Sequence, residues 1–113
     1  MVKVEAIIHP FKLDEIKAAL TELGIEGVTI LNVLDHSGSA GPKTHYRGSE
    51  YYADVPKVKL EMVVSSRHAE DVIEVISQST QSSLPDNGGV ILVYELAEAI
   101  RIRNGRRMEL ARY

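Results

Sequence analysis

The sequence predicts an α+β domain of the ferredoxin-like type, βαβ-βαβ, with a long loop between the second and third strands. Apolar residues alternate in some segments and recur at steps of three and four in two others, which predicts strands and helices respectively. Two successive βαβ units form four antiparallel strands with two helices on one face. The 113 residues suit one domain, 1–113, with a C-terminal segment at 95–113.

The first half of the chain has the pattern strand, helix, strand. Apolar and more polar residues alternate from 2 to 8, and His9 and Pro10 end this strand. A second strand is expected at 28–34, which is apolar and rich in β-branched residues. Between them, Gly24 follows the last residue of one helical face, which is a suitable C-terminal stop. That face consists of Leu13, Ile16, Leu20 and Leu23.

The second half repeats this order after the long loop. Residues 58–64 alternate clearly, and Ser65 or Ser66 can cap the helix that follows. A polar loop is expected at 78–89, before a buried strand at 90–94. The two helices leave one face of the sheet open, and oligomerisation is the usual cover for so short a chain. The second helix should turn inward Ala69, Val72, Ile73 and Ile76.

Composition limits the class of protein. No apolar run reaches the length of a membrane span, and the N-terminus lacks the layout of a signal peptide. The absence of cysteine excludes disulfides and fits a reducing cytoplasm. The net charge of −3 argues against general nucleic-acid binding. We therefore expect a cytoplasmic protein without membrane insertion.

The segment at about 36–54 is too long for an ordinary connection. It has little apolar periodicity, and loops of this length are usually functional or disordered. Its aromatic and charged residues suit contact with a partner protein. A long hairpin that extends from Val33 and Val55 is the structural alternative. The candidate contact residues are Tyr46, Arg47, Glu50 and Tyr51.

Four separated segments resemble the PII family of nitrogen-regulatory signalling proteins. Residues 6–14 resemble the family's start, 46–51 the tip of its long loop, 56–61 the following strand and 99–105 its C-terminal signature. The segments occur in order and with nearly constant spacing. The resemblance implies a trimer with a ferredoxin-like core that binds ATP or ADP between subunits, in many members together with Mg²⁺ and 2-oxoglutarate. It also implies that the long loop docks on a transporter or a metabolic enzyme.

The resemblance also assigns residues to the nucleotide. Ile7, Thr29, Glu61 and Val63 should lie near the adenine and ribose. Gly88 and Gly89 should approach the phosphates, with which Arg101 and Arg103 should pair. The other candidate nucleotide-binding positions are Ser37, Gly38, Ser39, Asn87 and Val90.

The chemistry of these residues allows such a site. If their segment is extended, Arg101 and Arg103 project from one face, and Ile100 and Ile102 point into the protein. Two guanidinium groups suit phosphate oxygens because each donates paired, charge-assisted hydrogen bonds. A glycine-rich turn at 86–89 would offer backbone N–H groups, although a plain hairpin turn explains it equally well.

Three departures from the family pattern affect ligand choice. Val90 replaces the phosphate-loop lysine, a loss of about 1.5–3 kcal/mol that could favour ADP or AMP. Arg106 or Arg107 could compensate. Ser39 replaces the glutamine that helps to hold Mg²⁺ and 2-oxoglutarate, so we expect weak or no 2-oxoglutarate binding. The chain is also one residue short between Tyr51 and Pro56, and together these changes indicate a divergent branch that reports energy state.

Other kinds of site are not favoured. His9, His36, His45 and His68 lack the spacing of metal ligands, so we expect no dedicated metal site. No nucleophile–base pair is evident, so we expect no enzyme. Two alternatives remain: a sensor of bicarbonate or a carboxylate near residues 37–39, and a structural or metal-handling trimer with Arg101 and Arg103 as surface charges. Tyr51 aligns with a tyrosine that some members have uridylylated, but we expect it to act chiefly in partner contact.

Overall fold

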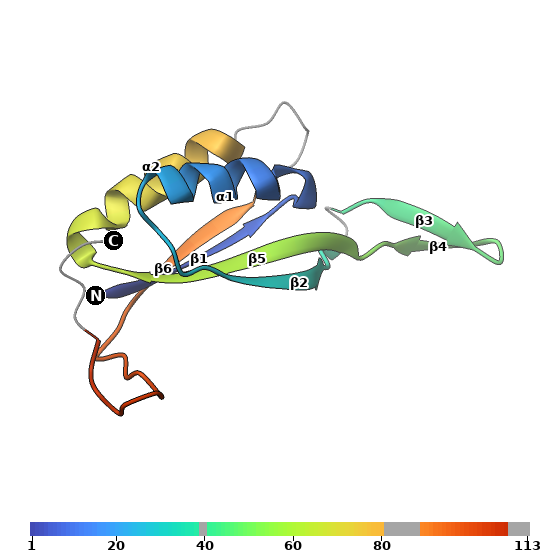
Figure 1. Cartoon of the computed structure of the whole chain (residues 1–113). Helices are drawn as coiled ribbons and strands as arrows, with labels where there is room; N and C mark the ends of the chain where they lie inside the picture. Colours follow the sequence, from blue (N-terminus) through green and yellow to red (C-terminus); the bar gives the residue numbers. More distant parts are fainter. Residues whose placement is uncertain (39–40, 81–88, 109–113) are drawn as a thin grey trace.

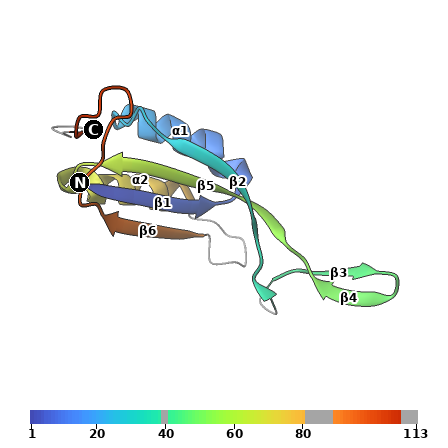
Figure 2. The same cartoon turned by 90° about the horizontal axis from the view of Figure 1, so that it is seen from below.

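A four-stranded antiparallel sheet carries two helices on one face (Figures 1 and 2). The computed structural model describes residues 1–38, 41–80 and 89–108. The strand order is β2-β5-β1-β6, and a separate two-stranded ribbon pairs β3 with β4. The elements are β1 (Val2–Ile8), α1 (Leu13–Glu22), β2 (Thr29–Asp35), β3 (Lys43–Tyr46), β4 (Ser49–Tyr52), β5 (Val55–Val64), α2 (Ala69–Thr80) and β6 (Val90–Glu95), with short 3₁₀ turns at Pro10–Lys12 and Ser66–His68. The predicted α+β class is confirmed, and the arrangement is compatible with the ferredoxin-like fold.

The core lies between the sheet and the two helices. In the central pair of strands, β1 and β5 run antiparallel from Val2 opposite Val64 to Ile8 opposite Val58. Residues that face each other across such a pair share one face of the sheet, so the apolar positions of both strands meet the helices. The buried core residues are Val2, Val4, Ala6, Ile8, Ile16, Leu20, Ile25, Val58, Leu60, Met62, Val64, Ala69, Val72 and Ile76. The predicted inward face of residues 58–64 is confirmed.

The helix boundaries follow local signals, with two corrections. Gly24 ends the first helix at a positive φ of 95°, and the Ser65 side chain accepts a hydrogen bond from the backbone of Arg67 at 3.2 Å. The second helix continues to Thr80, so the predicted loop start at 78 is wrong. Its polar end suits a solvent-facing turn, since Gln78 donates to Glu74 one turn earlier.

The inner face of the second helix also differs from the prediction at one margin. Ile73 is only partly buried, and Val75 packs against the core cluster in its place. At 100° per residue, positions 73 and 75 lie on opposite margins of the face centred on Val72 and Ile76. Periodicity therefore identifies the face, and packing decides which margin is covered.

The segment between β2 and β5 is a projecting ribbon, not a structureless loop (Figure 1). β2 and β5 pair as far as Asp35 and Val55, and β3 and β4 then form a hairpin. Arg47 and Gly48 form its turn with φ values of 52° and 78°, and a two-residue turn with both φ positive matches the strand twist. The predicted loop at about 36–54 is thus an ordered hairpin, as the structural alternative described, and its role in partner contact stays a prediction.

The base of the ribbon is closed by two contacts. The Ala53 amide donates to the Pro42 carbonyl at 2.7 Å, and His36 Nδ1 lies 2.7 Å from an Asp54 carboxylate oxygen. Both strands of the ribbon are exposed along their length. Among the described residues, no helix is long and apolar enough to cross a membrane.

Gly89 allows β6 to begin beside the end of β1. Its φ is 119°, and a β-carbon built on it would lie 2.1 Å from the Ile7 carbonyl oxygen. Val90, the next residue, pairs with Ile7 in the ladder. Only glycine fits this approach, because any side chain would push the two strands apart.

We predict that Gly89→Ala destabilises the protein by more than about 1 kcal/mol, because the backbone must move and adopt a strained φ. Chemical denaturation followed by circular dichroism measures this loss. Gly27→Ala is the matched control, since nothing lies within 4 Å of its added β-carbon. Equal stability of the two variants would contradict the close approach.

Candidate functional site

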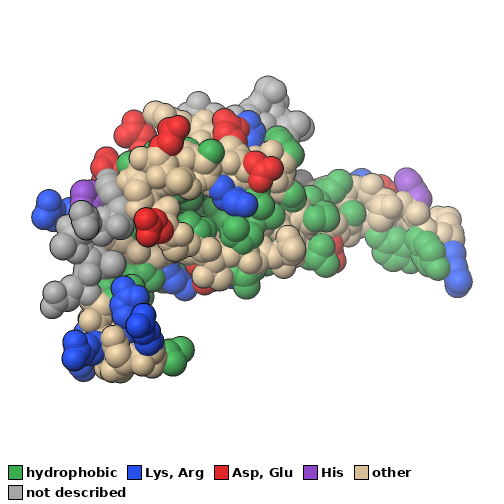
Figure 3. All heavy atoms as spheres, viewed as in Figure 1, with side chains coloured by type: hydrophobic (Ala, Val, Ile, Leu, Met, Phe, Trp, Pro, Cys, Tyr) green, Lys and Arg blue, Asp and Glu red, His purple; other side chains and the backbone are tan. Residues whose placement is uncertain are grey.

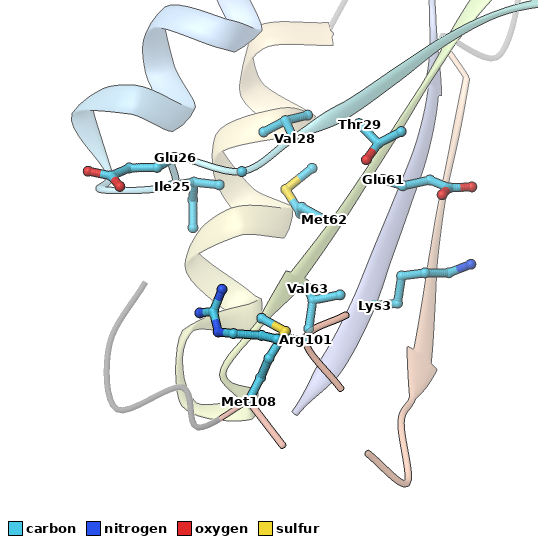
Figure 4. A pocket seen from close by; sticks show the side chains of 11 residues that line it. Lys3, Ile25, Glu26, Val28, Thr29, Glu61, Met62, Val63, Arg101 and Met108 are labelled. Carbon is cyan, nitrogen blue, oxygen red and sulfur yellow. The ribbon is translucent and has the colours of Figure 1, made fainter. Parts of the chain in front are cut away.

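A pocket of 680 Å³ lies where β2 begins, β5 ends and the C-terminal turn (residues 99–108) approaches (Figure 4). Four predicted nucleotide-binding residues line it: Thr29, Glu61, Val63 and Arg101. Thr29 stands directly opposite Glu61 in the β2–β5 ladder, so both occupy the sheet face that the helices leave open. Its other lining residues are Lys3, Ile25, Glu26, Gly27, Val28, Met62 and Met108. Two carboxylates, two cations and a partly apolar wall give it the mixed character of a small-molecule site.

A charged network crosses the open face of the sheet beside this pocket. Glu5, from β1, is buried and lies 3.3 Å from the Lys3 ammonium. The Tyr94 hydroxyl, from β6, donates to Glu5 at 3.1 Å. Lys59, from β5, lies 3.9 Å from both Glu5 and Glu61. The network therefore ties three strands together at the centre of the open face.

These contacts shift the acidity of three groups. Burial alone would raise the pKa of Glu5, but the hydrogen bonds from Lys3 and Tyr94 lower that pKa below its ordinary value of 4.5. The hydrogen bond to Glu5 raises the pKa of Lys3 above 10.5. The same acceptor raises the pKa of Tyr94 above 10.0, because the bond favours the protonated phenol. The shifts of Glu5 and Lys3 favour their charged forms at neutral pH, and the shift of Tyr94 keeps its phenol protonated as a donor.

The C-terminal arginines do not lie on an extended segment. The Gly105 amide donates to the Arg101 carbonyl at 2.8 Å, so residues 101–105 close a turn. Ile100 is 51% exposed and Ile102 is fully exposed, so the prediction that both point into the protein is wrong. Arg101 lines the pocket, whereas Arg103 lies in the turn and is not among the lining residues.

The other candidate residues lie away from the pocket. Val90 and Ile7 are paired at the β6 side of the sheet, next to Gly89. Since β2 and β6 are opposite edges, Val90 lies three strand spacings, or about 14 Å, from the strand that carries Thr29. Ser37 and Gly38 follow β2 at the base of the ribbon, where Gly38 accepts a hydrogen bond from the Gly41 amide. The remaining candidates, Ser39, Asn87 and Gly88, lie outside the described residues.

Comparison with known proteins gives the chain a family. Residues 1–106 match the family described as nitrogen regulatory protein P-II. The protein of that name from Rhodospirillum rubrum is 46% identical over 108 residues, which are 95% of this chain and 96% of the relative. Its namesake from Rhizobium meliloti is 45% identical over 106 residues, 93% of this chain and 94% of the relative. That from Pasteurella multocida is 41% identical over 110 residues, 96% and 97% of the two chains.

This chain belongs to the P-II family. Members of this family are regulatory signal transducers that act on partner proteins, and they are not enzymes. The resemblance that the four sequence segments indicated is therefore confirmed. The predicted absence of catalysis is confirmed on the same ground.

The ribbon of this P-II protein has two chemically different faces. Lys43, His45, Glu50 and Tyr52 share one face by their ladder positions, and Lys43 lies 3.2 Å from Glu50 and 5.7 Å from the Tyr52 ring centre. The other face carries Tyr46 and Tyr51, which are 61% and 51% exposed. The first face satisfies its own charges, whereas the second presents two phenol rings to solvent.

The four histidines lie in different surroundings. Lys57 donates to His9 at 3.1 Å, and the His9 ring stacks on Phe11 at 5.3 Å between centres. His36 contacts Asp54, His45 lies in β3, and His68 ends a 3₁₀ turn. Within the described ranges, no group of three or more possible metal-ligating side chains comes together.

Sequence reasoning missed several residues of this site. Lys3, Glu5 and Tyr94 form the charged network, and Gly27 and Met108 line the pocket. The alternation that identified the core also places Lys3, Glu5 and Glu61 on the opposite face, so that signal was present in the sequence. Met108 is brought to the pocket by the turn, which no local pattern predicts.

We predict that Glu5 stabilises the fold only while it is ionised. A carboxyl group whose folded-state pKa is lowered contributes its full stability above the ordinary value of 4.5, and loses it as the pH falls through the folded-state pKa. The stability difference between the wild type and Glu5→Gln should therefore narrow as the pH is lowered from 6 to 3, as measured by urea unfolding. Glu22→Gln, at an exposed position of the first helix, is the control. A difference for Glu5→Gln that does not change with pH would contradict this role.

Proposed function

We propose that this P-II protein is a cytoplasmic homotrimer that binds ATP or ADP between subunits and regulates a transporter or metabolic enzyme through its ribbon. The observation that carries the proposal is the division of the candidate nucleotide residues between two edges of one sheet. Thr29 lies on the β2 edge, where the pocket is. Val90 lies on the β6 edge, next to Gly89. If the β6 edge of one copy adjoins the β2 edge of another, the two groups form one cleft.

Exposed apolar surface supports the assembly. Leu31, Val90, Leu92 and Tyr94 lie on the open face of the sheet by their ladder positions, and each is about 40% exposed or slightly more. Ile102 adds a fully exposed side chain in the C-terminal turn. Val90, Leu92 and Tyr94 lie side by side along β6, and a second copy is the cover that a short chain can supply for such an apolar edge.

The chemistry of the two edges supports a nucleotide as the ligand. Arg101 supplies a guanidinium group at the pocket, and Gly89 belongs to the stretch that the family resemblance assigns to the phosphates. Val90 places an apolar side chain where the family has lysine, so we propose a preference for ADP or AMP over ATP. We also propose weak or absent 2-oxoglutarate binding, since Ser39 lacks the amide of the family's glutamine.

The ribbon supports the role in partner contact. Its Tyr46–Tyr51 face is exposed, and aromatic side chains are the residues most often found at the energetic centre of an interface. A two-residue turn fixes the ends of both strands, so the two rings are held on one side. We propose that Tyr51 serves as a contact residue, with modification as a secondary role.

We predict that replacing both Arg101 and Arg103 by alanine weakens ATP and ADP binding about a hundredfold or more, because each arginine can donate a charge-assisted hydrogen bond. Calorimetric titration with ATP, ADP and AMP, with and without Mg²⁺, measures this loss. Titration with 2-oxoglutarate and bicarbonate tests the other small anions.

Light scattering of the same samples provides the control for assembly. The double variant should keep the trimer mass, since both side chains are exposed. Unchanged nucleotide affinity in the variant would contradict the assignment of the site. A monomer mass for the wild type at micromolar concentration would contradict the proposed cleft between subunits.

We predict that Tyr51→Ala weakens capture of the regulated partner about tenfold, because the ring lies on the exposed tyrosine face. Tyr52→Ala is the matched control, since that ring lies on the opposite face beside Lys43. Quantitative pull-down from the source cells compares the two variants. Equal capture by both would refute the contact role, and a uridylyl adduct that follows nitrogen status in intact-mass spectra would instead make modification the main role of Tyr51.

A further inference from the structure

The two arms of the C-terminal turn are joined by one isolated β-bridge, which sets their register. Ile100 and Arg107 form an isolated antiparallel bridge. On one side of it the Met108 amide donates to the Ala99 carbonyl, and on the other the Arg101 amide donates to the Arg106 carbonyl, at 2.8 and 2.9 Å. Arg101 and Arg106 are therefore directly opposite each other. They form the next pair after Ile100 and Arg107, on the side nearer the tip of the turn.

This register decides which arginines share a face. Neighbouring residues on a strand point to opposite faces, and directly opposed residues point to the same one. Ile100 and Arg107 therefore lie on one face. Arg101, Arg106 and Met108 lie on the other, and two of these three line the pocket. The face that carries Arg106 is thus the face turned toward the pocket, as Figure 4 shows for Arg101 and Met108.

The two candidate arginines also differ in their partners. Arg107 Nε donates to a Glu98 carboxylate oxygen at 2.5 Å, so its charge is already matched. The side chain of Arg106 makes no ion pair with any carboxylate in the described part of the chain. Lys and Arg side chains gather over this turn in the space-filling view (Figure 3).

Two arginines in directly opposed positions repel each other. Like charges at such a cross-strand pair are destabilising, since their β-carbons lie only about 5 Å apart. A multivalent anion held between the two guanidinium groups removes the repulsion and accepts paired hydrogen bonds from both of them. The arrangement of Arg101 and Arg106 thus fits a phosphate group rather than a plain surface.

We propose that Arg106 is a further phosphate-binding residue of the nucleotide site and compensates in part for the positive charge that is lost at Val90. This inference rests on the proposed nucleotide-binding function. It assigns the compensating charge to Arg106 and not to Arg107, although the two are neighbours in sequence. The ligand class that it specifies is a nucleoside di- or triphosphate, whose outer phosphate groups contact the Arg101–Arg106 pair.

The test is calorimetric titration of the full-length protein with ADP, ATP and uncharged adenosine. Arg106→Ala should weaken ADP and ATP binding about tenfold, the effect of losing one charge-assisted hydrogen bond. Its affinity for adenosine should stay within about twofold of the wild type. Arg107→Ala, the matched control, should change ADP binding less than threefold. Arg106→Lys should retain part of the affinity, because lysine keeps the positive charge but lacks the paired N–H donors of a guanidinium group.

The outcomes separate this inference from the proposed function. If the wild type binds ADP and Arg101→Ala loses it, while Arg106→Ala behaves like Arg107→Ala, the inference fails and the nucleotide site stands. If Arg106→Ala weakens adenosine as much as ADP, its role is structural and the inference also fails. If the wild type binds no adenine nucleotide, the proposed function falls and this inference falls with it. Circular dichroism of each variant verifies that the fold is retained.

Discussion

The antiparallel pairing of β1 with β5 is the constraint on which the rest of the structure depends. Its register sets Val4 opposite Met62 and Glu5 opposite Glu61, so apolar pairs and charged pairs alternate along the two central strands. The apolar pairs meet the helices, and the charged pairs occupy the open face. A slip of one residue would exchange the two faces and bury Glu5 and Glu61 against the helices. The hydrophobic core therefore fixes the place of the charged groups that β1 and β5 contribute to the candidate site.

The open face combines features that are costly for an isolated chain. Glu5 is buried, and its carboxylate is stabilised by Lys3 and Tyr94 from either side. Around this network the neighbouring edge strands expose apolar residues such as Leu31 and Leu92. Water stabilises the charges of a solvent-exposed face, so such a face does not require ion pairs. Charges that another subunit would cover lose that water and must be paired within the chain. The self-contained network and the apolar border are thus both consistent with the proposed contact between subunits.

The sequence predicted the elements that contribute to the core and misjudged those that do not. Alternation in β5 and the helical spacing of Ile16 and Leu20 are local signals, because burial imposes them residue by residue. The ribbon lacks such a signal, since both of its faces are exposed. Its turn uses Arg47 at positive φ, which non-glycine residues seldom adopt. The resemblance to the family identified the candidate nucleotide-binding residues. Their separation onto opposite edges of the sheet follows from the strand order, which no local pattern shows.

The ribbon and the C-terminal turn share one physical property that bears on signalling. In the described part of the chain, the backbone of each pairs within its own segment, and side-chain contacts such as His36–Asp54 and Arg107–Glu98 help to hold it in place. Segments with exposed backbone hydrogen bonds and few buried apolar contacts open at a smaller free energy than the core. A ligand that contacts Gly38 or Arg101 therefore needs only modest binding energy to change either segment, while the β1–β5 pair stays fixed. The candidate partner face and Arg101 thus lie on the parts of the molecule that are easiest to rearrange, whereas Thr29, Glu61 and Val63 are held by the sheet.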